Sequence, residues 1–208
     1  MAKEYKKDKA YDIIHEKIIN CEYPPGSILN ESELIELIGT SRTPIREALN
    51  KLEHEGLITI IPKKCIWVNE ITWDSIVEEY EARMMIEPEL LKKYALEFSR
   101  EYWLDYLERC EKSVVLDEKI SLDEEFHDKL YSKNKNRYLK TVIEMVVNME
   151  HRNRSYRSNN ERATIGLNEH VKIVQRILEK DLEGAAANLR EHLKNACAYA
   201  EIKYLNYK

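Results

Sequence analysis

Three histidines and one aspartate are the side chains in this sequence best suited to binding a metal ion. Asp123 and His127 stand four residues apart, so they share one flank of a predicted helix. His170 and His192 each stand at the margin of an apolar stripe on a later predicted helix. One carboxylate and three imidazoles that converge between helices suit Zn²⁺, Ni²⁺, Mn²⁺, Fe²⁺ or Co²⁺. The pattern allows a metal site, but hydrogen-bonded structural histidines or solvated ones are the commoner explanation for histidines at such positions.

Two arginines form a second group that could do chemistry. Arg42 and Arg46 are four residues apart on a predicted helix over residues 41–55, roughly opposite its apolar face. Two guanidinium forks in this arrangement can read guanine O6 and N7 or clamp a phosphate. The alternative is a pair of solvent-exposed arginines on an ordinary amphipathic helix.

The elements around these arginines predict a winged helix-turn-helix. Apolar residues recur at helical spacing over residues 9–20, and Asn30 with Glu33 resembles a capping box opening a short helix that ends at Gly39. The helix over residues 41–55 ends at Gly56, and two β-rich runs follow at residues 57–61 and 66–68. In such a motif the N-terminal residues of the second helix of the pair enter the DNA major groove.

The rest of the chain predicts a second, helical part. Glycine and proline are concentrated in the first 62 residues, which places the boundary near residues 69–74. Pro88 is expected to kink or break the first helix of this part, and later helices are expected over residues 102–119, 122–131, 138–151, 167–180 and 182–204. The predicted fold class is mainly α. A winged helix-turn-helix with three helices and a β-hairpin wing occupies residues 1–70, and an all-α antiparallel helical bundle occupies residues 71–208.

Composition bounds the location and the partners. The chain carries 33 Lys and Arg against 38 Asp and Glu, a net charge of −5, whereas nucleic-acid-binding domains are usually basic. Residues 1–70 carry 10 Lys and Arg against 12 Asp and Glu, so DNA affinity would rest on a few grouped cations. The four cysteines are spread without a CxxC pair, and neither a signal peptide nor a membrane-spanning apolar run is present. A cytoplasmic protein without membrane contact is expected.

One run of residues carries a resemblance to a known family. Ser41-Arg-Thr-Pro-Ile-Arg-Glu-Ala-Leu49, with Glu33-Leu34 before it and Glu55-Gly-Leu57 after it, resembles the DNA-binding signature of the GntR superfamily of bacterial transcription regulators. The resemblance implies double-stranded operator DNA as a partner. It implies a DNA-binding surface made of Glu33, Arg42, Thr43, Arg46 and, in the wing, Lys63 and Lys64. The family commonly has a glycine at the wing tip, where this chain has Cys65.

The second part resembles the FCD effector domain of the FadR-like branch of that superfamily. The resemblance rests on Leu122-Asp-Glu-Glu-Phe-His127, Asn168-Glu-His170 and Arg190-Glu-His192-Leu193. It implies that a divalent transition metal is bound by Asp123, His127, His170 and His192.

The same resemblance implies a small carboxylate effector at or beside the metal. Arg83 matches an inward-pointing arginine that could pair with this carboxylate, although a salt bridge to Glu79 or Glu87 on the same helix fits equally well. Asn195, one turn after His192, is a weaker candidate for lining the pocket.

The function implied is that of a homodimeric regulator whose two winged helices read a pseudo-palindromic operator and whose DNA binding is changed by the effector. Two alternatives stay open. One is a metal-dependent hydrolase or lyase that uses the Asp/His₃ centre. The other is a metal ion that is purely structural.

Overall fold

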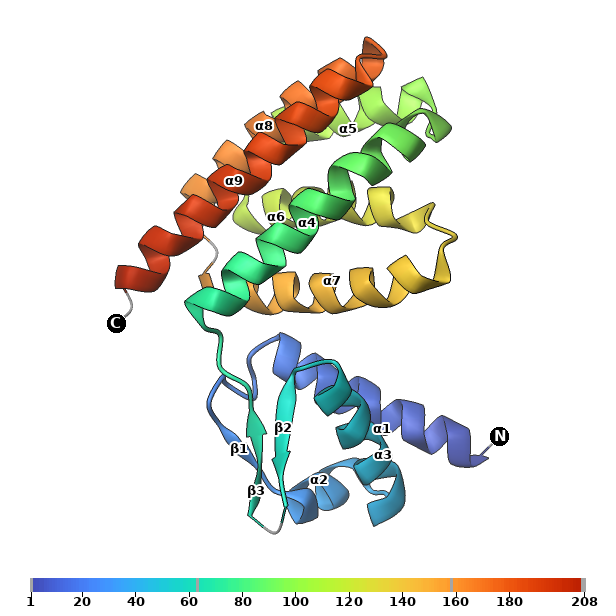
Figure 1. Ribbon diagram of the computed structural model, residues 1–208, viewed down its shortest axis with the longest axis vertical. Coiled ribbons are helices and arrows are strands. Elements are labelled where there is room, and N and C mark those ends of the chain that lie inside the picture. Colours follow the sequence, from blue (N-terminus) through green and yellow to red (C-terminus); the bar gives the residue numbers. More distant parts are fainter. Residues whose placement is uncertain (1, 63, 158, 207–208) are drawn as a thin grey trace. The chain divides into compact units, whose positions relative to one another are not determined.

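The computed structural model describes residues 2–62, 64–157 and 159–206, and the chain divides into two compact units (Figure 1). The first unit comprises Met1–Thr72 and Val147–Tyr156. The second comprises Trp73–Val146 and Arg157–Lys208. The predicted class, a winged helix-turn-helix followed by a helical domain, is confirmed.

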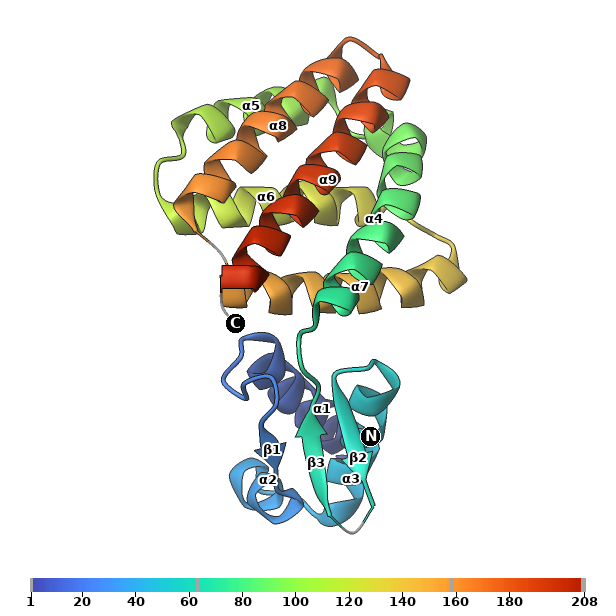
Figure 2. The ribbon, with the colours of Figure 1, turned by 60° about the vertical axis from the view of Figure 1, so that its left-hand side comes forward.

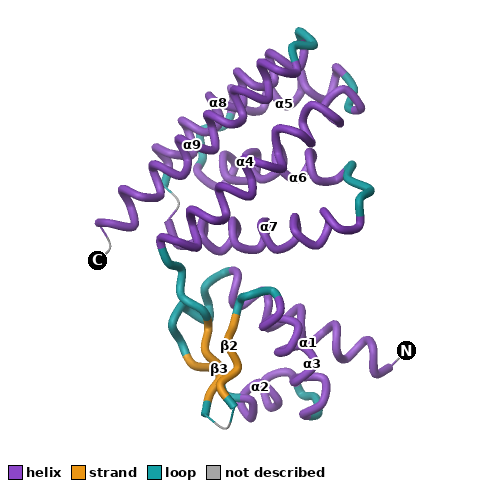
Figure 3. The backbone as a smooth tube through the Cα atoms, in the orientation of Figure 1, coloured by secondary structure: helices purple, strands orange, loops and turns teal. Residues whose placement is uncertain are grey.

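The first unit combines three helices with a small antiparallel sheet (Figure 3). Its elements are α1 (Ala2–Ile19), β1 (Ile28–Leu29), α2 (Glu31–Ile38), α3 (Arg42–His54), β2 (Ile58–Ile61) and β3 (Cys65–Val68). The strand order is β1-β3-β2, so the predicted hairpin is present and a two-residue strand that the sequence did not predict pairs with its other edge. Cys65 is the first residue of β3 and pairs with Ile61.

Local signals explain where these helices begin and end. The Asn30 side chain accepts a hydrogen bond from the Ser32 N–H and so caps α2. Gly39 and Gly56 adopt φ of 67° and 74°, left-handed values that glycine takes without a steric penalty. These signals define both ends of α2 and the C-terminal end of α3.

The core of the first unit forms where α1 and α3 pack together. Ile14 and Ile18 of α1 and Ile45, Ala48 and Leu52 of α3 are fully buried. Burying five such side chains removes the apolar stripe of each helix from water, which is the main stabilising contribution here. The opposite face of α3, which carries the two arginines, stays exposed.

The C-terminal half of α7 (Arg137–Arg157) belongs to the first unit. Its Met149 packs against the core described above. Its Arg152 is buried and donates a hydrogen bond to the backbone oxygen of Asn69, just after β3. A contiguous domain ending near residue 70 does not include this segment.

The second unit contains the remaining helices. They are α4 (Trp73–Tyr94), a short 3-10 helix (Ala95–Glu97), α5 (Arg100–Lys112), α6 (Leu116–Ser132), the first half of α7, α8 (Asn160–Leu178) and α9 (Leu182–Asn206). Helices α8 and α9 run antiparallel side by side, and α4 lies along α9 (Figures 1 and 2). Helix α6 crosses this layer and contacts both α4 and α8 (Figure 2). The crossing brings side chains of α4, α6, α8 and α9 together.

One sequence-based expectation about helix limits is wrong, and one of two alternatives at Pro88 is excluded. Residues 102–119 form two helices, because Ser113 and Val115 adopt extended backbone between α5 and α6. Pro88 does not break α4, which continues from Trp73 to Tyr94. Ile76, Leu90 and Leu91 are buried on both sides of Pro88, and this packing offsets a cost of roughly 3 kcal/mol for proline inside a helix.

Within the part of the chain that the structure describes, none of the helices is long and apolar enough to cross a membrane.

Candidate functional site

Four potential metal ligands meet inside the second unit, and we call Asp123, His127, His170 and His192 the ligand cluster. Asp123 and His127 come from α6, His170 from α8 and His192 from α9. One ligand atom from each residue lies within 4.8 Å of those of the other three. The three histidines are buried and Asp123 is partly buried. Three helices far apart in sequence thus supply one compact group.

His127 is oriented by a buried carboxylate on α4. Its Nδ1 lies 2.7 Å from Oε2 of Glu87, whose exposed fraction is 0%. A carboxylate can only accept, so Nδ1 carries the proton, and in the neutral ring Nε2 then carries a lone pair. This Nε2 atom is buried and makes no hydrogen bond to any described residue. A buried acceptor without a partner is costly, and metal coordination would satisfy it.

His170 and His192 are oriented in the same sense. The Tyr106 hydroxyl donates its hydrogen to the backbone oxygen of Leu122, so His170 Nδ1 must donate to the Tyr106 oxygen, 3.0 Å away. Nδ1 of His192 donates to Oε2 of Glu169 at 2.8 Å. In both rings Nε2 is therefore the free acceptor.

The cluster fits a divalent metal for this reason. Nε2 of His170 and Nε2 of His192 are 3.3 Å apart with both lone pairs facing inward, an arrangement that repels without a cation between them. Nε2 of His170 also lies 3.5 Å from Oδ1 of Asp123. Nitrogens that share one ion at about 2.0–2.1 Å are separated by about this distance. Each of the three imidazoles binds a carboxylate or a hydroxyl through its other nitrogen. Such partners are the usual outer shell of a metal site.

The surroundings keep the ligands in the protonation states that a metal needs. Burial lowers the pKa of His170 well below its usual value, and His192 next to it acts in the same direction. Burial also lowers the pKa of His192, although its bond to Glu169 opposes this. Burial opposes ionisation of Glu87, but the charge of Arg83 and the hydrogen bonds from His127 and Tyr131 hold the pKa of Glu87 well below its usual value. Neutral imidazoles beside ionised carboxylates are the metal-binding forms.

Gly166 leaves room next to the cluster. A Cβ at this position would lie 3.6 Å from Oδ1 of Asp123 and 3.8 Å from Cε1 of His192. Any longer side chain on this turn of α8 would project toward the ligands. Glycine within a helix costs roughly 0.5–1 kcal/mol relative to alanine, and close approach of neighbouring groups is a usual reason for it.

Arg83 lies inside the protein with its charge already paired. Its exposed fraction is 3%, and its Nε donates to Oε1 of Glu87 at 2.6 Å. Its Nη1 lies 3.6 Å from Oε1 of Glu79. The salt bridge to Glu79 and Glu87 that the spacing allowed is therefore formed, and Arg83 holds the carboxylate that orients His127. A direct contact from Arg83 to an effector stays a prediction.

Asn195 holds the carboxylate that orients His192. Its Nδ2 donates to Oε1 of Glu169 at 2.7 Å. Arg162 donates to Oε2 of the same carboxylate from Nη1 and Nη2, at 3.0 and 3.1 Å. Burial opposes ionisation of Glu169, but these bonds and that of His192 hold its pKa below the usual value. Asn195 itself is exposed, so its place in an effector pocket stays a prediction.

We expect Glu87→Gln to weaken metal binding about 10–100-fold, the usual effect of losing an outer-shell partner. The amide removes the negative charge that pairs with Arg83 and fixes the His127 tautomer. Competition with a coloured chelator would measure the affinity. Glu89→Gln is the matched control, because Glu89 is on the same helix and its side chain is 57% exposed. Equal metal affinity in both variants would contradict the role given to Glu87.

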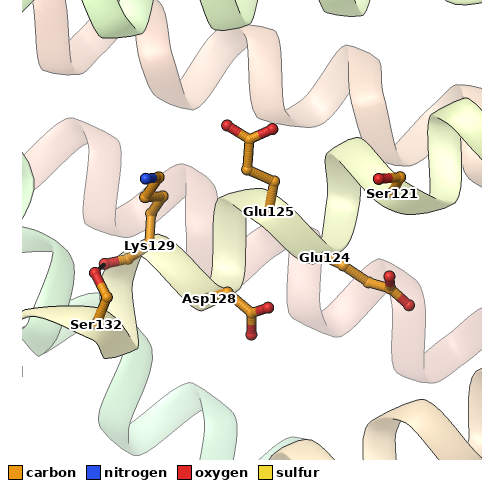
Figure 4. A pocket seen from close by; sticks show the side chains of 6 residues that line it. All are labelled: Ser121, Glu124, Glu125, Asp128, Lys129 and Ser132. Atoms are coloured by element: carbon orange, nitrogen blue, oxygen red, sulfur yellow. Dashed lines mark hydrogen bonds between the residues drawn. The ribbon is translucent and has the colours of Figure 1, made fainter.

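The outer face of α6 carries a separate surface pocket of about 390 Å³ (Figure 4). Six residues line it, namely Ser121, Glu124, Glu125, Asp128, Lys129 and Ser132. None belongs to the ligand cluster, because residues 123 and 127 occupy a different stripe of the helix. Glu125 is paired with Arg109 at 2.6 Å. This pocket has a charged lining and shares no lining residue with the ligand cluster.

The predicted DNA-contacting residues lie on the exposed side of the first unit. Arg42 and Arg46 have side chains 64% and 61% exposed, and Thr43 and Lys64 are exposed as well. Glu33 is exposed on α2. Lys63 lies outside the described residues. Contact with DNA by these residues stays a prediction.

Sequence reasoning missed a groove between α3 and the wing. It has a volume of about 600 Å³, and its lining includes Glu31, Arg46, Asn50 and Lys64. Asn50 is one turn after Arg46 on the exposed face of α3, a spacing that could have identified it. No sequence signal singled out Glu31, which forms ion pairs with both Arg42 and Arg46.

The fold agrees with comparisons to known proteins. Residues 6–68 match the bacterial regulatory proteins of the gntR family, and residues 78–195 match the FCD domain. The chain belongs to the GntR family of regulators with an FCD domain. It is a DNA-binding transcriptional regulator.

Individual relatives extend over most of the chain. The chain is 29% identical over 199 residues to the "Uncharacterized HTH-type transcriptional regulator YdhC" of Bacillus subtilis, covering 91% of this chain and 88% of that protein. It is 32% identical over 132 residues to the "Nta operon transcriptional regulator" of Aminobacter aminovorans, covering 60% and 62%. Among solved structures it resembles E. coli McbR/YncC, with a TM-score of 0.76, 18% identity and coverage of 96% and 98%. At that identity the structural likeness shows the fold alone.

Proposed function

We propose that this regulator senses a small carboxylate at a divalent metal held by the ligand cluster, and that sensing changes its binding to operator DNA. The observation that carries the proposal is the shared orientation of three buried histidines, each with Nδ1 bound outward and Nε2 turned inward. Asp123 supplies a fourth ligand atom within 4.8 Å. The residues that hold the metal are thus Asp123, His127, His170 and His192.

The metal would supply a positive charge and open coordination positions for an anionic ligand. Four protein ligands leave positions open on ions that prefer six, such as Mn²⁺, Fe²⁺, Co²⁺ and Ni²⁺, and Zn²⁺ can expand beyond four. Gly166 keeps the space beside Asp123 and His192 clear of side-chain atoms. Arg83 would hold Glu87 in place, and Glu87 in turn orients His127. Contact with the effector would be a second role of Arg83.

On the DNA side, residues 1–70 would act as the DNA-binding domain and residues 71–208 as the effector-binding and dimerisation domain of a cytoplasmic homodimer. Each protomer would place Arg42, Thr43 and Arg46 in a major groove of a pseudo-palindromic operator, with Lys63 and Lys64 of the wing and Glu33 at the same surface. For the effector to regulate, it must bind the DNA-competent and DNA-incompetent forms with different affinity.

A metal-dependent hydrolase or lyase has less support. A general base would have to stand near the metal, but the adjacent carboxylates of Glu87 and Glu169 each accept a hydrogen bond from a ligand histidine. The relatives named above are transcriptional regulators. Sensing therefore accounts better for the cluster than turnover.

A thermal-shift screen of mono-, di- and tricarboxylates tests this proposal, with and without 1,10-phenanthroline, a chelator that has no carboxylate. We expect at least one carboxylate at about 100 times its Kd to raise the Tm by about 5–10 °C, because ligand linkage then contributes about 2.7 kcal/mol. The shift should vanish when the metal is removed. A carboxylate shift that is equally large in chelator would contradict sensing at the metal.

A further inference from the structure

Glu31 stands between the two arginines of the recognition helix. Its Oε1 lies 3.1 Å from Nε of Arg42 and 3.0 Å from Nε of Arg46. One carboxylate oxygen on α2 therefore lies beside two guanidinium groups on α3, and it accepts a hydrogen bond from Nε of Arg46. The Glu31 side chain is 26% exposed, while the two arginines are exposed by more than half.

The local structure keeps Glu31 in this place. It is the first residue of α2, directly after the cap residue Asn30, whose side chain is bound to the N–H of Ser32. A negative charge is favoured in the first turn of a helix by the helix dipole. Glu31 and Arg46 also line the groove between α3 and the wing. The carboxylate therefore lies at the base of the surface from which the arginines project.

The atoms used in these contacts matter for DNA recognition. Both ion pairs with Glu31 are made at Nε, so this carboxylate leaves the terminal Nη1 and Nη2 groups of each arginine as a fork. Such a fork reads a guanine through its O6 and N7 atoms, and this requires the guanidinium group to point in a fixed direction. Phosphate is bound by any nearby cation and requires much less direction.

The charge of Glu31 also favours base reading over phosphate binding. Two arginines alone would present two positive charges to the DNA backbone, and Glu31 cancels one of them. It therefore lowers the attraction to phosphate that every DNA sequence offers equally. It also reduces the repulsion between two guanidinium groups one helical turn apart.

We propose that Glu31 is a specificity-determining residue, which holds Arg42 and Arg46 through Nε so that their forks read guanine bases in preference to phosphates. The proposal rests on the DNA contact proposed for these two arginines. Glu31 acts through the arginines and need not touch the DNA. Exposed ion pairs contribute little to folding, so the contacts are better explained by orientation than by stability.

The test compares affinity for two DNA duplexes. One is the sequence that the full-length wild-type protein selects from a random pool, and the other is a shuffled duplex of the same composition. Glu31→Ala should lower the ratio of selected to shuffled affinity at least about 10-fold. It should also tighten binding to the shuffled duplex and steepen its salt dependence, because a cation is unmasked.

Glu36→Ala is the matched control, because it removes the same charge from an exposed position of the same helix. Glu31→Gln, which keeps an oxygen acceptor without the charge, should retain more selectivity than Glu31→Ala. Melting temperatures of all variants would show that they are folded. A ratio that is unchanged in Glu31→Ala, or that falls no further than in Glu36→Ala, would overturn the role of Glu31. Failure of the wild type to select any sequence would instead contradict DNA reading by the arginines.

Discussion

Replacing Arg46 with alanine is expected to lower affinity for the selected operator duplex about 100-fold or more while the protein stays folded. A bidentate contact to guanine discriminates by about 1–3 kcal/mol, and a dimer on a pseudo-palindrome makes the contact twice. The Arg46 side chain is 61% exposed, and it forms an ion pair with Glu31 at the surface. Its loss should therefore cost little stability.

Fluorescence anisotropy with labelled duplexes measures this effect. Arg190→Ala is the matched control, since Arg190 is an arginine on α9 whose side chain is 41% exposed and pairs with Glu89. Affinity for the shuffled duplex should fall much less than affinity for the selected duplex. If the Arg46→Ala variant bound the selected duplex as tightly as the Arg190→Ala variant does, α3 would not be the reading helix.

Removing the metal is expected to lower the Tm by about 8–16 °C. Without a cation, three inward-facing Nε2 atoms share a buried space, and those of His170 and His192 stand 3.3 Å apart. An ion at about 1,000 times its Kd contributes about 4 kcal/mol, and each kcal/mol moves the Tm of a chain of this size by about 2–4 °C. Differential scanning calorimetry with and without 1,10-phenanthroline measures the change.

His170→Ala provides the independent check, because the variant should melt near the temperature of the chelated wild type and respond little to chelator. His54→Ala is the matched control, since His54 is exposed in the last turn of α3 and outside the ligand cluster. A chelator effect of the same size in the His170→Ala and His54→Ala variants would show that the metal binds elsewhere. If chelation lowered the Tm while carboxylates still acted normally, the metal would be structural only.

The parts of the fold that the sequence predicted are those with local signals. The turn at Gly39 and the helix end at Gly56 were visible because left-handed backbone favours glycine. The strand Ile28–Leu29 was missed, since two residues leave no alternation to detect. The break at Ser113 was missed because its neighbours include neither glycine nor proline.

In the candidate site, too, the sequence predicted what local spacing shows and missed contacts between distant residues. The four possible ligands were visible because each stands at a regular offset from apolar positions on its own helix. Their outer partners were not, because Glu87 is 40 residues from His127 and Tyr106 is 64 residues from His170. Only the crossing of α6 with α4 and α8 brings these residues together. Spacing on one helix cannot show which buried carboxylate meets which imidazole.

Metal content tests the central claim most directly. The full-length protein would be loaded with a divalent transition metal, passed through a desalting column and analysed for metal per chain by inductively coupled plasma mass spectrometry. The ligand cluster predicts one ion per chain in the wild type and in His54→Ala, and less than about a tenth of that in His170→Ala. One ion per chain in the His170→Ala variant, or none in the wild type, would contradict a metal centre at Asp123, His127, His170 and His192.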